Sequence, residues 1–137
     1  KYDAVILACF SDPALEQARE ISDILVTGIE EISLHVAAML GSKFTVLTMT
    51  DKRVPSKEAH VRRFKLEGSL ASVRPLGMSV AEIEADEKRA CAQILKVAKE
   101  AAEKDGAECW AAPVWPAMPM LCAAIWAWRS STPPLWR

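Results

Sequence analysis

The alternation of short apolar runs with stretches of helical spacing constrains the fold of this chain more than any other feature. A short, almost wholly apolar run is typical of a parallel strand that is covered on both faces. Strands are expected at residues 3–10, 24–26, 44–49 and 70–73, and helices at 12–23, 30–40, 57–64 and 80–104. Strands that alternate with helices predict an α/β fold with a mostly parallel sheet flanked by helices.

Turn and cap residues support the predicted boundaries. Asp12 is suited to cap a helix that begins at Pro13, because its carboxylate accepts backbone N–H groups and proline is tolerated at the first helical position. Glu30 and Glu31 open the next helix, where acidic side chains complement the helix dipole. Gly41 is expected as the residue that follows the end of that helix.

Cys9 lies between the first predicted strand and the helix that follows it. Open α/β sheets bind ligands at the carboxyl ends of their strands, and a helix N-terminus favours the thiolate form of a nearby cysteine. Position alone leaves two interpretations open: a reactive thiol at a ligand site, and a structural cysteine in the core, where free cysteines are common. Thr48 and Thr50 mark a second such edge, at the end of the third strand.

The remaining polar candidates are interpreted as structural. His35 and His60 lie within helical patterns and lack further ligands at metal spacing. Cys91 is on the apolar side of the long predicted helix and is expected to fill the core. Glu30 and Glu31 are interpreted as first-turn helix charges rather than as a catalytic carboxylate pair. The sequence contains no glycine-rich phosphate motif.

Composition argues against several classes of partner. With 137 residues and 51% hydrophobic content, the chain can form one globular domain. Its 17 basic residues are interleaved with 18 acidic ones, so nothing indicates binding to nucleic acid or to an acidic membrane. The four cysteines have no CxxC or metal-finger spacing, which favours a reducing compartment. Because no signal peptide or transmembrane span is found either, we expect a cytoplasmic protein.

A series of motifs runs through the chain in a fixed order. The first is an apolar strand that ends in Ala8-Cys-Phe-Ser-Asp-Pro13. The others are Val26-Thr-Gly-Ile29, Phe44-Thr-Val-Leu-Thr48, Ala71-Ser-Val-Arg74 and Asp105-Gly-Ala-Glu108. Together they resemble the hydantoin racemase branch of the aspartate/glutamate racemase superfamily, which carries A-C-F-G-D-P at its first catalytic cysteine. The resemblance covers residues 2–108.

This resemblance implies a cofactor-independent racemase that acts on 5-substituted hydantoins, allantoin or related amino-acid derivatives. Cys9 would be one of two catalytic cysteines that exchange protons with opposite faces of a small-molecule substrate. The resemblance implies no cofactor or metal, and it is compatible with a homo-oligomer. The residues that it places beside the substrate are Phe10, Ser11, Gly28, Thr48 and Met49. Ser11 replaces the usual glycine, and Met49 replaces the second threonine of a T-T pair.

Members of this family have two similar α/β lobes with the substrate between them. The resemblance assigns residues 1–28 to the remainder of the first lobe and residues 29–109 to the second, so the N-terminal part of such an enzyme is expected to be missing. Residues 110–137 form an aberrant tail that contains all five tryptophans and five of the eight prolines. Its prolines predict that no regular strand or helix forms there.

A shifted reading frame, natural or from sequencing, would explain this tail, and the alternative is simply an unusual tail. Read from Cys109 onward, the alternative frame can spell L-G-C-A-G-M-A, which is the family's second cysteine motif. Cys109 and Cys122 then have no catalytic role, and the chain as it stands is expected to have negligible racemase activity. Two other interpretations stay open: a non-catalytic fragment that keeps a partial fold, and a decarboxylase or maleate isomerase of the same superfamily.

Overall fold

The computed structural model describes residues 2–112. Its strands are β1 (Ala4–Leu7), β2 (Leu25–Gly28), β3 (Phe44–Thr48), β4 (Leu70–Pro75) and β5 (Cys109–Ala111). Its helices are α1 (Leu15–Ile21), α2 (Ile29–Leu40), α3 (Val54–Arg63), α4 (Val80–Ala85) and α5 (Glu87–Asp105), with short 3-10 helices η1 (Asp51–Arg53) and η2 (Glu67–Ser69). The predicted alternation of strands and helices is therefore present along most of the chain.

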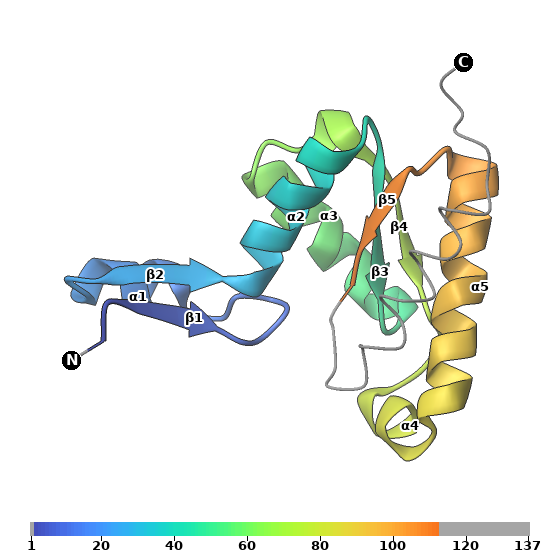
Figure 1. Cartoon of the computed structure of the whole chain (residues 1–137), viewed down its shortest axis with the longest axis horizontal. Helices are drawn as coiled ribbons and strands as arrows, with labels where there is room; N and C mark the ends of the chain where they lie inside the picture. The colour runs from blue at the N-terminus through green and yellow to red at the C-terminus, as the bar shows by residue number, and fades with distance from the viewer. Residues whose placement is uncertain (1, 113–137) are drawn as a thin grey trace.

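The described strands form two parallel sheets. β1 pairs with β2, and Leu7 at the end of β1 lies opposite Gly28 at the end of β2. β3 is the central strand of the second sheet, which has the order β4-β3-β5. Figure 1 shows β1, β2 and α1 as an arm, from which α2 leads to the larger sheet; α2 and α3 lie on one side of that sheet and α5 on the other. The predicted α/β architecture with parallel strands and flanking helices is confirmed.

The larger sheet contains the main core. Every residue of β3 is buried, because helices cover both faces of this sheet. Phe44 and Val46 pack with Leu34 of α2 and Val61 of α3. Leu47 belongs to a second cluster, which includes apolar residues of α5. β3 therefore has the burial on both faces that an apolar parallel strand requires.

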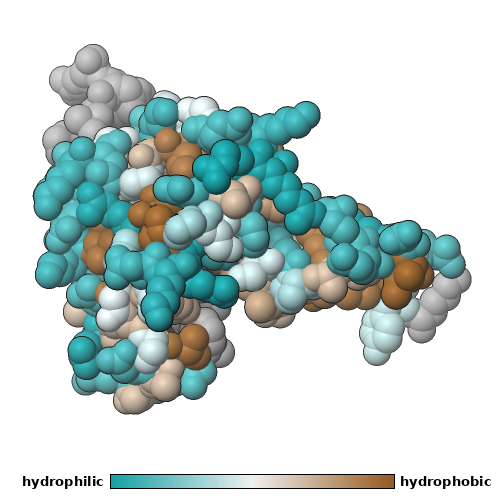
Figure 2. Space-filling view, turned by 180° about the vertical axis from the view of Figure 1, so that it is seen from behind, coloured by the Kyte–Doolittle hydropathy of each residue, from teal (hydrophilic) through white to brown (hydrophobic). Residues whose placement is uncertain are grey.

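The first strand does not have this burial, which corrects the prediction. Among the described residues β1 pairs only with β2, and the side chains of Val5 and Ile6 are exposed. Leu15 is the buried residue of α1, and Ile21 at the end of this helix is 87% exposed. Figure 2 shows apolar surface toward the outer end of the arm. The apolar run correctly predicts a strand, but residues 2–112 do not supply a cover for both of its faces.

One helix boundary agrees with the prediction and one does not. α2 ends at Leu40 and Gly41 follows it, as predicted, with an extended backbone of φ −154°. The long helix predicted at 80–104 is two helices, because Asp86 leaves the helical conformation between them. The Asp86 carboxylate accepts the backbone N–H of Arg89 at 2.9 Å and so caps α5. Aspartate is prone to such local side-chain bonds, which compete with the continuation of a helix.

The apolar pattern in the sequence of α2 predicts its buried face only in part. The apolar positions of that pattern are Ile32, Val36, Ala37, Met39 and Leu40, and of these Ala37 is buried while the other four are exposed. Glu30 and Leu34 are buried beside Ala37. A buried glutamate requires polar partners.

β5 corrects the prediction for the C-terminal tail. Trp110 and Ala111 pair with Thr45 and Val46 of β3, so the expectation of no strand from residue 110 onward is wrong for this short strand. The rest of that prediction concerns residues 113–137, which lie outside the described residues. No helix within residues 2–112 is long and apolar enough to cross a membrane.

Candidate active site at the Cys9 turn

Residues 9–12, here called the Cys9 turn, follow β1 at its carboxyl end. The Cys9 carbonyl accepts the N–H groups of Ser11 at 2.8 Å and of Asp12 at 2.9 Å, which closes the turn. Cys9 itself is exposed, and its thiol is free. Within the described part of the chain Cys9 is thus an exposed residue and not a core residue.

Asp12 caps a different helix from the one predicted. Its Oδ1 accepts the N–H of Glu30 at 3.0 Å and its Oδ2 accepts that of Glu31 at 2.7 Å, so its carboxylate occupies the N-terminus of α2. Pro13 lies outside any helix, and α1 begins after Ala14 without a side-chain cap. The helix N-terminus at the Cys9 turn is therefore that of α2, eighteen positions along the chain from Asp12. An acidic group is favoured there by the helix dipole.

Gly28 makes this capping contact possible. A Cβ atom at this position would lie 2.1 Å from Cγ of Asp12, which is far inside van der Waals contact. Gly28 also precedes α2 directly and lies opposite Leu7 in the sheet. Gly28 thus lies at the Cys9 turn, where its lack of a side chain admits the Asp12 carboxylate.

Phe10 fixes the turn to the main core. Its side chain belongs to the cluster that contains Leu34 and Phe44. The Lys57 ammonium of α3 lies 4.9 Å from the centre of the Phe10 ring and also donates to the Phe10 carbonyl at 2.9 Å. The residue next to Cys9 is therefore anchored through both its ring and its backbone.

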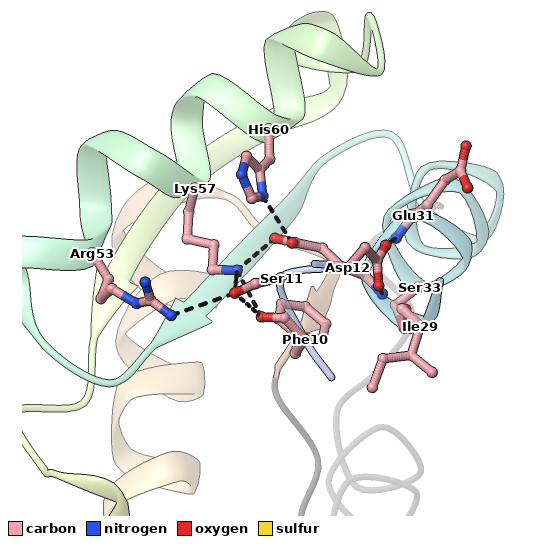
Figure 3. A network of polar contacts seen from close by, with 10 residues as sticks. Phe10, Ser11, Asp12, Ile29, Glu31, Ser33, Arg53, Lys57 and His60 are labelled. Atoms are coloured by element: carbon pink, nitrogen blue, oxygen red, sulfur yellow. Dashed lines mark hydrogen bonds and ion pairs between the residues drawn. The ribbon is translucent and has the colours of Figure 1, made fainter. Parts of the chain in front are cut away.

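Glu30, Lys57 and His60 form a polar group, here called the Glu30 cluster, in which Glu30 and Lys57 are buried and His60 is partly exposed. Figure 3 shows Lys57 and His60 on the same helix, with Lys57 beside Phe10 and Ser11 of the Cys9 turn. Lys57 Nζ lies 2.7 Å from Oε1 of Glu30, and His60 Nδ1 lies 2.8 Å from Oε2. The Glu30 and Lys57 side chains are only 1% and 4% exposed. Glu30 lies in the first turn of α2, as predicted, but its charge is buried and has side-chain partners, which the helix dipole alone does not explain. Glu31 lies in the same turn and forms a partly exposed ion pair with Arg19.

The segment that follows β3 in the chain also contacts the Cys9 turn. Thr48 is buried, and Met49 follows it at the carboxyl end of the strand. Arg53 of η1 then approaches Ser11, with 3.4 Å between Nη2 and Oγ, and Lys57 Nζ lies 3.3 Å from the same oxygen. Ser11 thus connects the carboxyl edge of the β1–β2 sheet with the segment that follows the carboxyl end of β3.

The other polar candidates lie away from this turn. Cys91 of α5 is partly buried, and desolvation, with a smaller contribution from Glu87, raises the pKa of its thiol. His35 of α2 is exposed; its Nδ1 lies 2.8 Å from the Glu31 carbonyl oxygen, and its ring packs edge-on against Phe64. Within residues 2–112 no group of three or more histidine, cysteine or acidic side chains is arranged to bind a metal ion.

An exposed thiol at the carboxyl edge of parallel strands is typical of α/β proteins that bind small molecules at this edge. Comparison with known families makes the assignment specific. The chain belongs to the Asp/Glu/hydantoin racemase family, because the model of this family matches residues 1–109. The resemblance inferred from the sequence motifs is thereby confirmed.

Individual relatives support the same branch of the family. Hydantoin racemases of Pseudomonas sp. (strain NS671) and Rhizobium meliloti are 33% and 36% identical to this chain over 106 residues. Each match covers 77% of this chain but only 43% and 44% of the respective relative, so the chain spans less than half the length of these curated proteins.

Solved structures agree with this result. A crystal structure of an allantoin racemase from Pseudomonas fluorescens matches with a TM-score of 0.82 at 32% identity, over 97% of this chain and 56% of that one. An allantoin racemase from Klebsiella pneumoniae matches with a TM-score of 0.84 over 93% of this chain and 52% of that one. At 22% identity, the second likeness shows the fold alone.

Proposed function

We propose that this chain is the part of a cofactor-independent hydantoin or allantoin racemase that carries one of two proton-transfer cysteines, Cys9. The observation that supports this most is the exposure of Cys9 at the carboxyl end of β1, within the motif Ala8-Cys-Phe-Ser-Asp-Pro13. The similarity to hydantoin and allantoin racemases favours this activity over a decarboxylase or a maleate isomerase.

The proposed reaction needs two bases on opposite sides of the substrate. The Cys9 thiolate removes the proton from C5 of the hydantoin ring, and the electron pair left on carbon spreads onto the adjacent carbonyl as an enolate. A second thiol then donates a proton to the other face of C5, which inverts the centre. Backbone N–H groups at strand ends stabilise the enolate oxygen, so the reaction needs neither a metal nor pyridoxal phosphate.

The second cysteine of this proposal lies outside residues 1–109. In the proposed enzyme residues 1–28 belong to one lobe and residues 29–109 to the other, with the substrate between them. The alternative reading frame from Cys109 onward would restore the missing motif. Phe10, Ser11, Thr48 and Met49 are the residues that we place beside the substrate, together with Gly28 at the base of the turn.

The experiment compares this exact chain with a restored enzyme, in which the alternative frame is used after residue 108 and the N-terminal segment of a hydantoin racemase precedes residue 1. Both are assayed by polarimetry on each enantiomer of a 5-substituted hydantoin. We expect racemisation by the restored enzyme and none by the chain as it stands, because only the former carries both bases. Comparable activity in the two would contradict the two-cysteine mechanism.

Cys9→Ser in the restored enzyme tests the role of Cys9 directly. A hydroxyl is far less acidic than a thiol, so the rate from at least one enantiomer should fall by about 100-fold or more. Cys91→Ser is the matched control, since Cys91 lies on α5, away from the turn, and it should leave the rate unchanged. Circular dichroism shows whether both variants keep the fold. Unchanged rates from both enantiomers in Cys9→Ser would rule out a base role for this residue.

A further inference from the structure

We propose that Lys57 is a positioning residue for Cys9, and that the Glu30 cluster exists to keep the Lys57 ammonium at the Cys9 turn. The meaning of this inference for catalysis rests on the proposed function. Its structural content, that the conformation of the turn depends on Lys57, does not.

All three N–H donors of Lys57 are engaged, and two of them at the turn. Nζ lies 2.9 Å from the Phe10 carbonyl and 3.3 Å from Ser11 Oγ, and the third partner is Glu30 Oε1 at 2.7 Å. Figure 3 shows the Lys57 side chain extending from α3 toward these three atoms. The two residues that follow Cys9 are therefore bound by one buried cation.

The need for a counter-ion explains the rest of the cluster. Removing an ammonium group from water is costly unless its charge is matched and its donors are satisfied. Glu30 on α2 supplies the negative charge that matches the Lys57 ammonium. The second oxygen of the Glu30 carboxylate contacts His60, which lies one turn after Lys57 on α3. No buried side-chain nitrogen or oxygen of the described residues lacks a hydrogen-bond partner. The cluster is thus a complete polar network built around the lysine.

Stability alone does not explain a buried ion pair, because well-packed apolar side chains of similar volume stabilise a fold as much or more. An apolar residue at position 57 would, however, leave the Phe10 carbonyl and the Ser11 hydroxyl without their ammonium partner. Asp12, on the far side of the turn, has its own anchor at the N-terminus of α2. At Phe10 and Ser11 the other polar contacts are that of Arg53 with Ser11 Oγ at 3.4 Å and the Ser11 hydroxyl's own bond to the Phe10 carbonyl at 2.6 Å. Lys57 is therefore the buried cation that binds both residues from another element.

The test replaces both charges at once, with Glu30→Leu and Lys57→Met in one variant of the full 137-residue chain. Backbone 15N relaxation measures the order of each residue in the turn. We expect the order parameters of Cys9, Phe10 and Ser11 to fall from about 0.85 toward about 0.6, while those of β3 stay unchanged. A folded double variant in which the order of the turn is unchanged would overturn the inference.

Asp105→Asn provides the matched control. It removes the charge that pairs with Arg74. This partly buried pair joins β4 to the end of α5, the helix on the opposite face of the larger sheet from α2 and α3, so the change should leave the order of the Cys9 turn unaltered. Loosening of the turn in this control as well would show a general effect of stability and would also overturn the proposal.

Two further measurements keep the test decisive. Should the double variant fail to fold, Ser11→Ala removes a Lys57 contact at a partly exposed position, and unchanged order at Phe10 and Ser11 would then count against the inference. In the restored enzyme the double variant should lower kcat about 10-fold to 100-fold, because a displaced base loses its alignment. If that enzyme does not racemise hydantoins at all, the proposed function fails, while the order parameters still decide the role of Lys57.

Discussion

Removing one partner of the Glu30–Lys57 ion pair should cost much more stability than removing both. The charges lie 2.7 Å apart and the side chains are 1% and 4% exposed, so loss of one partner belongs to the class that costs about 3–5 kcal/mol. Glu30→Leu leaves the Lys57 ammonium without a counter-ion, so its loss of unfolding free energy should be near the upper end of this range. Lys57→Met leaves the Glu30 carboxylate in contact with His60 at 2.8 Å, so its loss should be near the lower end. The double variant buries neither charge and should be within about 1 kcal/mol of the unaltered protein.

Urea unfolding at pH 7, followed by circular dichroism, measures these differences. With an m-value of about 2 kcal/mol/M, a loss of 3–5 kcal/mol moves the unfolding midpoint by about 1.5–2.5 M. Glu31→Gln is the matched control, because the Arg19–Glu31 pair is as short, 2.6 Å, but its side chains are 37% and 22% exposed. It should cost no more than about 1 kcal/mol. Equal losses for Glu30→Leu and Glu31→Gln, or additive losses in the double variant, would refute the reasoning.

Two further predictions follow from contacts outside the Glu30 cluster. Hydrogen bonding to Arg74 is the main cause that holds the pKa of Asp105 below its ordinary value of 3.8. Because that pKa is lowered on folding, the pair should stabilise the protein at pH values above about 4 and lose this effect as pH falls through the lowered pKa. Asp105→Asn should thus lower the melting temperature at pH 7 but not in strong acid; an equal loss at both pH values would contradict this. Gly28→Ala should displace Asp12 from the N-terminus of α2, since the added Cβ would lie 2.1 Å from Asp12 Cγ, and cost about 1–2 kcal/mol in urea unfolding; an unchanged midpoint would show that the turn accommodates the methyl group.

Local sequence patterns predicted the architecture because they depend on residues that are close together in the chain. The run of apolar and β-branched residues at 44–49 is enough to indicate a strand, and the buried strand β3 occurs there at Phe44–Thr48. The order of strands and helices follows in the same way. The boundary that failed, at Asp86, depends on a backbone conformation that no apolar period encodes.

The site was predicted in part. Cys9 lies at the end of a strand as expected, and Ser11 and Gly28 lie at the same turn. Asp12, by contrast, was predicted to cap the helix that follows it directly, but it caps α2 instead. The choice between the two helix N-termini depends on how β1 and β2 pair, with Leu7 opposite Gly28.

The Glu30 cluster was missed because its members are far apart in the sequence. One local signal was present: Lys57 and His60 are three residues apart on one helix and therefore lie on the same face. Glu30, however, looks like any first-turn glutamate until α2 and α3 pack together. Sequence alone thus determined the fold class, the family and the place of Cys9, since these follow from local pattern and motif. Only the tertiary structure decided which charges are buried, because burial depends on partners 27 and 47 positions away in the chain.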